Sequence, residues 1–300
     1  MYKKMLVPLD GSPLAELALP YVRKMCTEFD LKATFLHVCQ EHESDSLFMC
    51  KSYIERIAEN TAKQLGRNEV DFEAVTQSGN VAQKILEQAD KSASDLILMA
   101  AHGYSGPGLW RLGSIVHKVL TASRTPILVV RDELAREHIE SWPKNVILPL
   151  DGSALSEEAL PHALAMAHTG AELTLLRVCE QPDLLADYPE SDMPESWNEH
   201  VKLAVGGAER ACGVYLNEVN QKKLTAELAN VSTNVVLASS ASEGIMEYAK
   251  KNPKALIVMS THGKSGLSLW PYGHVADRVL MAASNPILLV RPRSAQSRAA

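Results

Sequence analysis

The chain repeats its own residues over a long distance. Residues 102–113 (HGYSGPGLWRLG) recur as HGKSGLSLWPYG at 262–273, and VPLDGS at 7–12 recurs as LPLDGS at 148–153. Solenoid repeats have periods of roughly 20–50 residues, whereas these two copies are each as long as a domain. The chain therefore contains one domain twice, and whatever fold the first copy adopts must be built again by the second.

Composition agrees with two soluble domains. The chain has 300 residues, 46% hydrophobic and 22% charged, which at roughly 150 residues per domain predicts two cores. No apolar run approaches the roughly 18 residues of a membrane span, and residues 1–4 resemble no signal peptide, so we expect a cytoplasmic protein. Five cysteines without CxxC spacing favour neither a disulfide framework nor a zinc ribbon. A net charge of −6 argues against nucleic-acid binding.

Short apolar runs alternate with amphipathic stretches in each copy. The expected strands are apolar on both faces, as in a buried parallel sheet. They are 5–9, 31–38, 70–75, 96–99 and 127–130, then 146–150, 172–178, 225–237, 256–259 and 287–290, and the first copy's helices are 13–26, 52–65, 81–93 and 114–122. This alternation predicts an α/β fold of two tandem Rossmann-like domains, each an open, five-stranded, mainly parallel sheet with helices on both faces.

We expect domains at 1–131 and 145–293, joined by a polar linker at 132–144 and followed by a tail at 294–300. The second copy has 20 extra residues between its second and fourth strands, because 83 positions separate Cys179 from His262 but 63 separate Cys39 from His102. We assign much of this excess to the acidic segment 182–197, which has three prolines and suits no regular element. It is either a solvated loop or a flap over the carboxyl ends of the strands.

Two segments are candidates for chemistry. Asp10 follows the first strand, where its carboxylate either accepts hydrogen bonds from a ribose, holds a metal beside phosphates, or simply forms a turn. The glycine-rich loop after the fourth strand ends at Gly113-Ser114, at the start of a helix. Unpaired N–H groups and the helix dipole favour an anion there, although such loops are also common as tight turns.

Together these residues resemble the universal stress protein family over essentially the whole chain. Its ATP-binding members have an Asp after the first strand and Gly-x-x-Gly, nine residues, then Gly-Ser/Thr after the fourth. The first copy has Ala100 in place of the first glycine, then Gly103, nine residues and Gly113-Ser114. The second copy has Ser260, Gly263, Gly273 and His274 at these positions.

The resemblance implies ATP (or ADP or AMP) as ligand, with Mg²⁺. Asp10 would contact the ribose or Mg²⁺, and the Val38 backbone the adenine edge. Gly103, Gly113, Ser114 and Ile115 would contact the phosphates, Met99 and Ala100 would line the pocket, and His102 would position the backbone or touch the ligand. The predicted binding residues are Pro8, Asp10, Val38, Met99, Ala100, His102, Gly103, Gly113, Ser114 and Ile115, with no catalytic residue and no metal ligand.

In the second copy His274 replaces a hydroxyl and Pro271 removes an amide, so we expect the nucleotide in the first copy. A stress-response regulatory module without rapid turnover is the leading functional interpretation. A slow ATP hydrolase is one alternative, although GxxxxGK[ST], GxGxxG, SGGxDS and HxGH motifs are all absent. A nucleotide-free scaffold, or a carrier of another small ligand, is the other.

Family dimers commonly pair through their last strand. The two copies of that strand, 127–130 and 287–289, are therefore expected to pair within one chain, which avoids leaving an apolar strand edge exposed. Further association into a homodimer is also expected.

Overall fold

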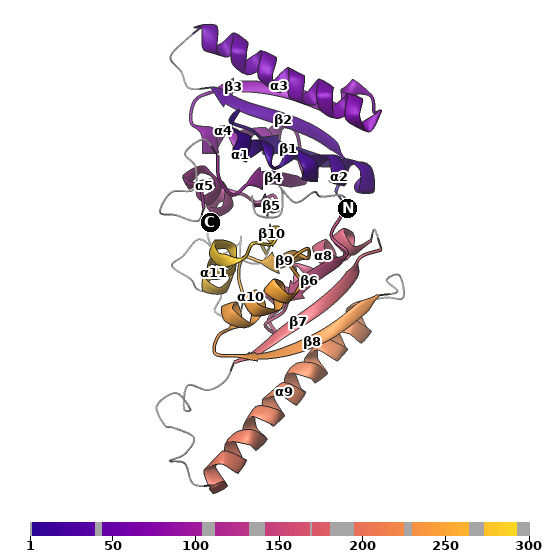
Figure 1. The fold of residues 1–300 in the computed structure, drawn as a ribbon, viewed down its shortest axis with the longest axis vertical. Coiled ribbons are helices and arrows are strands. Elements are labelled where there is room, and N and C mark those ends of the chain that lie inside the picture. The colour runs from indigo at the N-terminus through magenta and orange to yellow at the C-terminus, as the bar shows by residue number, and fades with distance from the viewer. Residues whose placement is uncertain are drawn as a thin grey trace.

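The structure is a computed structural model that describes residues 2–39, 44–103, 112–131, 142–168, 170–180, 195–224, 230–263 and 273–292. These residues form one ten-stranded sheet in the order β3-β2-β1-β4-β5-β10-β9-β6-β7-β8 (Figure 1). The strands are β1 (Lys4–Pro8), β2 (Lys32–Cys39), β3 (Phe72–Ser78), β4 (Leu96–Ala100), β5 (Ile127–Val130), β6 (Asn145–Pro149), β7 (Glu172–Glu180), β8 (Val231–Ala238), β9 (Leu256–Ser260) and β10 (Ile287–Val290).

Neighbouring strands are parallel within each half of the sheet, and the halves meet where β5 runs antiparallel to β10, with Leu128 opposite Leu288. The predicted α/β class with two repeated, mainly parallel domains is confirmed.

The helices are α1 (Pro13–Glu16), α2 (Leu19–Phe29), α3 (Ser44–Leu65), the 3₁₀ turn η1 (Glu69–Asp71), α4 (Val81–Lys91), α5 (Ser114–Ala122), α7 (Ala154–Glu157), α8 (Leu160–Ala167), α9 (Glu195–Lys223), α10 (Ala241–Lys251) and α11 (His274–Ala282).

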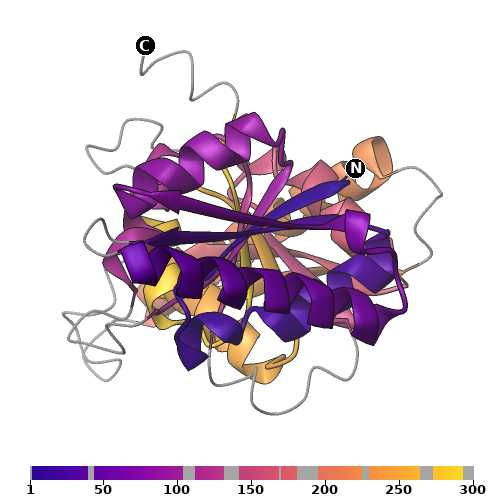
Figure 2. The same cartoon turned by 90° about the horizontal axis from the view of Figure 1, so that it is seen from above.

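Helices cover both faces of the sheet (Figure 2). On one face α2, α3, α8 and α9 contribute to a single buried cluster with strand residues such as Met5, and on the other α4, α5, α10 and α11 form a second cluster with residues such as Leu6. Met5 and Leu6 are both completely buried, as expected of a parallel strand with apolar side chains on both faces. Each cluster contains residues from both halves, so the two domains share their cores.

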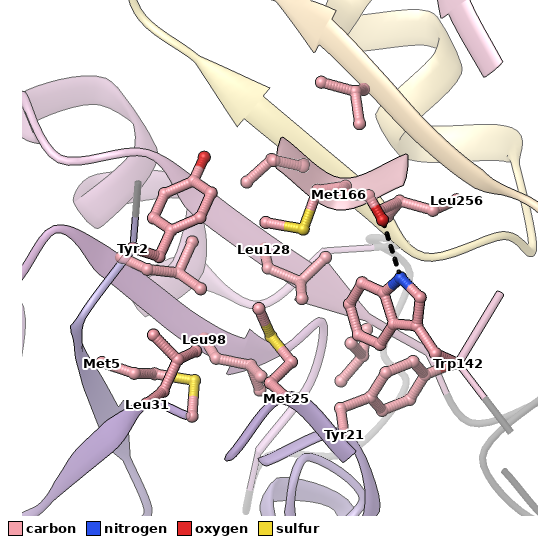
Figure 3. Close-up of a cluster of buried hydrophobic side chains, with 14 of the residues drawn as sticks. Tyr2, Met5, Tyr21, Met25, Leu31, Leu98, Leu128, Trp142, Met166 and Leu256 are labelled. Carbon is pink, nitrogen blue, oxygen red and sulfur yellow. Dashed lines mark hydrogen bonds between the residues drawn. The ribbon is translucent and has the colours of Figure 1, made fainter. Parts of the chain in front are cut away.

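Two aromatic contacts also join the halves. Buried Trp142 donates from Nε1 to the carbonyl oxygen of Met166 at 3.1 Å (Figure 3), and its ring packs edge-on against Phe29, with centroids 5.2 Å apart. The Tyr2 hydroxyl lies 2.5 Å from Nδ1 of His162. Residues from the start of the first domain thus contact α8 of the second.

Several predicted bounds are corrected. The helix expected at 13–26 is two helices, α1 and α2, because Pro20 in the first turn of α2 has no N–H to continue the preceding turn. The strand expected from Val70 begins at Phe72, since Asn68 caps η1 and Val70 is exposed. Helix α3 begins at Ser44 rather than at 52.

The predicted insertion 182–197 is also partly wrong. Helix α9 begins at Glu195, so the last three residues of that segment are helical, while 181–194 and the expected flap lie outside the described residues. Helix α9 has 29 residues against 22 in α3, so a longer helix accounts for part of the excess. The tail 294–300 and most of the linker 132–144 also lie outside the described residues, and the domain bounds stay a prediction.

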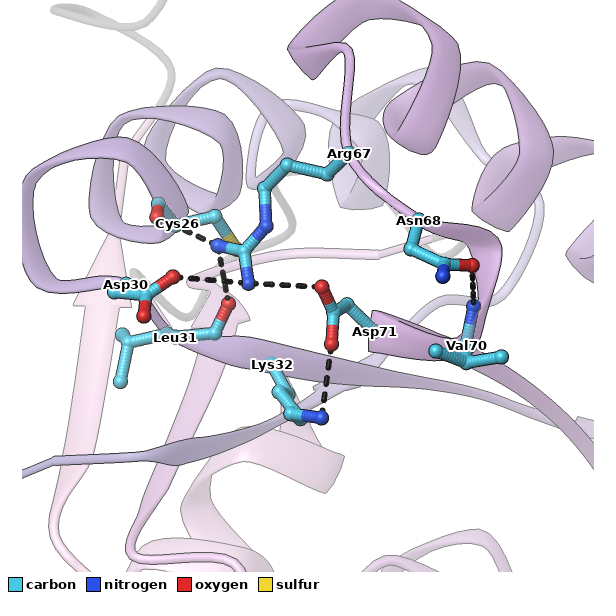
Figure 4. A network of polar contacts seen from close by, with 8 residues as sticks. All are labelled: Cys26, Asp30, Leu31, Lys32, Arg67, Asn68, Val70 and Asp71. Atoms are coloured by element: carbon cyan, nitrogen blue, oxygen red, sulfur yellow. Dashed lines mark hydrogen bonds and ion pairs between the residues drawn. The ribbon is translucent and has the colours of Figure 1, made fainter.

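A half-buried arginine contacts three elements of the first domain (Figure 4). Arg67, just after α3, donates from Nη1 to the carbonyl oxygens of Cys26 at 2.9 Å and Leu31 at 3.0 Å. Its Nη2 contacts the carboxylates of Asp30 and Asp71, each at 3.1 Å. Arg67 therefore fixes the ends of α2 and α3 relative to the beginning of β2, and the carboxyl end of this strand lines a cavity.

Candidate functional site

The turn after β1 fixes the Asp10 carboxylate. Gly11 has a φ of +81°, a left-handed conformation that glycine adopts without strain. Ser12 caps α1, its Oγ accepting from the amide of Ala15 at 3.1 Å, and Asp10 Oδ1 accepts from the amide of Ser12 at 2.9 Å. The predicted turn and cap are therefore present, and they hold Asp10 at the carboxyl end of the strand.

The loop after β4 passes directly over this turn. A Cβ on Gly103 would overlap the Asp10 carboxylate, so only glycine fits there without displacing it. The amide of Gly113 donates to the carbonyl oxygen of Ala101 at 2.8 Å, which returns the loop to the start of α5. Gly113 occupies the N-cap of α5 and supplies no side-chain cap, leaving the first-turn N–H groups without that partner.

A cavity of about 630 Å³ opens between these segments, at the carboxyl ends of β1, β2 and β4. The sheet order changes direction beside β1, and open α/β sheets bind their ligands at such a switch point. The cavity brings together all the predicted binding residues: Pro8, Asp10, Val38, Met99, Ala100, His102, Gly103, Gly113, Ser114 and Ile115. Their contacts with a ligand stay a prediction, and residues 104–111 of the repeated motif lie outside the described residues.

Apart from Val38, the residues that line the cavity from β2 and α3 are not among the predicted binding residues. His37, Cys39 and Cys50 line the cavity, and Tyr53 packs edge-on against His37, with ring centroids 5.6 Å apart. His37 lies with Nδ1 2.8 Å from the carbonyl oxygen of Leu9, to which it donates, since a carbonyl only accepts. The available signal was the alternation in β2, which directs residues 37 and 39 to the same face.

Burial shifts the pKa values of the side chains on the β2 and α3 side of the cavity. Burial lowers the pKa of His37, while its hydrogen bond to Leu9 opposes the shift, so the imidazole is neutral at pH 7. Burial, and then the hydrogen bond with Cys50, raises the pKa of Cys39 to about 12, which keeps it a protonated thiol. Burial and a 2.9 Å hydrogen bond to Glu16 likewise raise the pKa of Tyr53.

The second domain has an equivalent cavity of about 510 Å³. A Cβ on Gly263 would overlap the Asp151 carboxylate, and the Gly273 amide donates to the carbonyl oxygen of Thr261 at 2.6 Å, as in the first domain. The chemistry differs, because His274 begins α11 where Ser114 begins α5.

The two cavities also differ at the strand that lines them, β2 in the first domain and β7 in the second. Arg177 replaces His37 and donates from Nη1 to the carbonyl oxygen of Leu150 at 2.9 Å. Burial and the nearby Arg291 charge lower the pKa of His262, which lines this cavity. The two domains therefore share the frame of the site and differ in the groups that face it.

The sequence model of the universal stress protein family matches residues 1–131 and 143–291. The chain belongs to this family. Universal stress protein YxiE of Bacillus subtilis is 30% identical over an alignment of 148 positions that covers 44% of this chain and 100% of YxiE. A universal stress protein of Mycolicibacterium smegmatis is 26% identical over an alignment of 310 positions that covers 96% of this chain and 97% of the relative.

Solved structures of the family have the same fold. The crystal structure of a universal stress protein from Archaeoglobus fulgidus matches with a TM-score of 0.66 at 16% identity, covering 96% of both chains. The tandem arrangement inferred from the internal repeat is thus confirmed by the two matched segments. Among the helices that the structure describes, none combines the length and the apolar character needed to cross a bilayer.

Proposed function

We propose that the first domain binds an adenine nucleotide, with ATP as the leading candidate, and that the protein is a regulatory stress-response module. One observation carries the proposal: the Asp10 carboxylate and the uncapped start of α5 border the same cavity. A carboxylate accepts hydrogen bonds from ribose hydroxyls or holds Mg²⁺, and the N–H groups of a helix start favour phosphate. The ribose and the phosphates of a nucleotide therefore each have a matching group.

The apolar part of the cavity wall suits the adenine base. Its wall includes the apolar side chains of Val38, Met99 and Ile115. A volume of about 630 Å³ falls within the roughly 300–1,000 Å³ of small-molecule sites, which combine apolar walls with a few polar groups. Ala100, which replaces the family's glycine, is 9% exposed and adds a methyl group to the wall.

The proposal includes no rapid chemical step. The sequence has no phosphate-binding lysine motif of the GxxxxGK[ST] type, and phosphoryl transfer depends on such positioning and charge. We therefore propose binding without fast turnover, with slow hydrolysis as the alternative. The cytoplasmic location, the homodimer and the role of Mg²⁺ remain predictions.

Calorimetric titration of ATP into the full-length protein, with and without Mg²⁺, tests the proposal. We expect one site per chain. Asp10→Asn should weaken binding about tenfold or more, since a hydrogen bond to a charged group contributes roughly 1.5–3 kcal/mol. Asp151→Asn, the same change in the second domain, should leave the affinity unchanged. Absence of binding by ATP, ADP and AMP would refute the nucleotide, and an effect of Asp151→Asn alone would refute its assignment to the first domain.

A further inference from the structure

Thiol and imidazole groups from β2 and α3 cluster on one side of the first cavity, and none of them has a role in the proposed nucleotide binding. His37 and Cys39 lie on the same face of β2, and Cys50 comes from α3. One ligand atom from each of the three residues lies within 4.8 Å of the others. Side chains from two elements thus converge at one point on the cavity surface.

The orientation of His37 leaves a nitrogen available. Nδ1 donates to the carbonyl oxygen of Leu9 at 2.8 Å, so the tautomer that makes this bond carries its lone pair on Nε2. Metal-binding histidines commonly donate their other ring N–H to a backbone carbonyl or carboxylate, which fixes the tautomer and the ring orientation. The Tyr53 ring, packed edge-on at 5.6 Å between centroids, further restricts the imidazole.

The sulfur atoms are positioned for the same ligand. Cys39 is 3% exposed and Cys50 is half-buried, and both line the cavity. Zn–S bonds of about 2.3 Å and Zn–N bonds of about 2.0 Å place tetrahedral ligand atoms roughly 3.5 Å apart. Small side-chain rotations therefore bring the three atoms from their present separation into a coordination sphere.

We propose that His37, Cys39 and Cys50 bind one Zn²⁺ ion, with the fourth coordination position open to the first cavity. Two thiolates and an imidazole select Zn²⁺ over Mg²⁺ or Ca²⁺, which prefer oxygen ligands. Each thiol releases its proton to solvent as its sulfur coordinates the ion. All three residues line the cavity, so a fourth ligand reaches the ion from that side.

The second domain supplies an internal comparison. Cys179 and Cys212 both line its cavity, so the thiol pair is repeated. Arg177 occupies the position of His37, and its guanidinium donates to the carbonyl oxygen of Leu150 at 2.9 Å. A guanidinium offers no lone pair to a metal. The proposal therefore requires one ion per chain, bound in the first domain.

Zinc binding to tag-free, fully reduced, full-length protein tests this site without any nucleotide. Equilibrium dialysis with elemental analysis should give one Zn²⁺ per chain, and Co²⁺ should produce the thiolate-to-metal absorption band. Because the assay contains no nucleotide, its result is independent of the function proposed above.

Matched variants locate the ion. His37→Arg copies the contact seen at Arg177, so this variant should fold. Its zinc affinity should fall by more than the about 10–100-fold that follows the loss of a hydrogen-bond partner of a metal ligand. Cys50→Ser should also abolish binding, Cys212→Ser should not alter it, and Arg177→His should raise the stoichiometry to two. Unchanged zinc affinity in His37→Arg, or a wild-type protein that binds no zinc and merely oxidises Cys39 and Cys50 to a disulfide, would overturn the proposal.

Discussion

A side chain at position 103 would overlap the Asp10 carboxylate, because the loop after β4 crosses the turn after β1 at the closest approach that a glycine permits. The same restriction applies to Gly263 and Asp151. Neither glycine has a left-handed φ, so the requirement comes from proximity rather than from backbone conformation. The repeated His-Gly sequence thus conserves a contact between two segments in each domain, while the neighbouring residues are free to differ.

Gly103→Ala should therefore displace the Asp10 carboxylate and weaken ATP binding about tenfold, the value expected for losing one charged hydrogen bond. Gly263→Ala introduces the same methyl group against Asp151 and serves as the matched control. It should reduce stability by a similar amount and leave ATP affinity unchanged, as measured by calorimetric titration and urea unfolding. Equal losses of affinity in the two variants would show that the Asp10 contact is not specific to the nucleotide.

At the scale of elements, the clearest sequence signals were short apolar runs with polar or proline boundaries. Strand β5 was predicted at its observed bounds because Pro126 precedes it and the charged Arg131 follows. The break between α1 and α2 was missed because the apolar periodicity continues across it, and only Pro20 marks the second helix start. The thiol and imidazole cluster was missed for another reason, since its residues come from a strand and a separate helix.

Arg67, just after α3, contacts the end of α2 and the residue before β2. Arg67→Ala removes the donor to the carbonyl oxygens of Cys26 and Leu31, and we expect the free energy of unfolding to fall by about 2–3 kcal/mol. Arg67→Lys should recover only part of this loss, because a single ammonium cannot reproduce the planar guanidinium fork. Urea unfolding of the full chain measures both.

The control for Arg67 is its ion-pair neighbour. Lys32 contacts Asp71 at 2.9 Å, but its side chain is 58% exposed, so Lys32→Gln should cost less than about 1 kcal/mol. Hydrogen bonds from Lys32 and Arg67 lower the pKa of Asp71. The stabilisation from this carboxylate is therefore present above its usual value of about 3.9 and is lost as the pH falls through the lowered pKa. If Lys32→Gln is as destabilising as Arg67→Ala, surface charge rather than the guanidinium hydrogen bonds holds these elements together.

At the scale of the whole molecule, the two domains are not separate folding units in space. The ten-stranded sheet continues from β5 to β10, and each buried cluster on its faces includes residues from both domains. Trp142, at the end of the linker, also packs against Phe29 of the first domain. Chains of this length commonly unfold domain by domain, but here the unfolding of either domain would expose apolar surface of the other.

We therefore expect a single cooperative transition in calorimetry, with equal calorimetric and van't Hoff enthalpies. Leu6 and Ile147 are completely buried at equivalent positions of β1 and β6, one in each domain. Leu6→Ala and Ile147→Ala each remove about 2–5 kcal/mol of core stabilisation, so each should shift that one transition down by roughly 4–10 °C. Two resolved transitions, with each substitution shifting only its own, would instead mean that the shared sheet contributes little and that the domains unfold independently. The cooperative result would give ligand binding in the first domain a direct effect on the second, because a ligand that stabilises one folded domain then stabilises both.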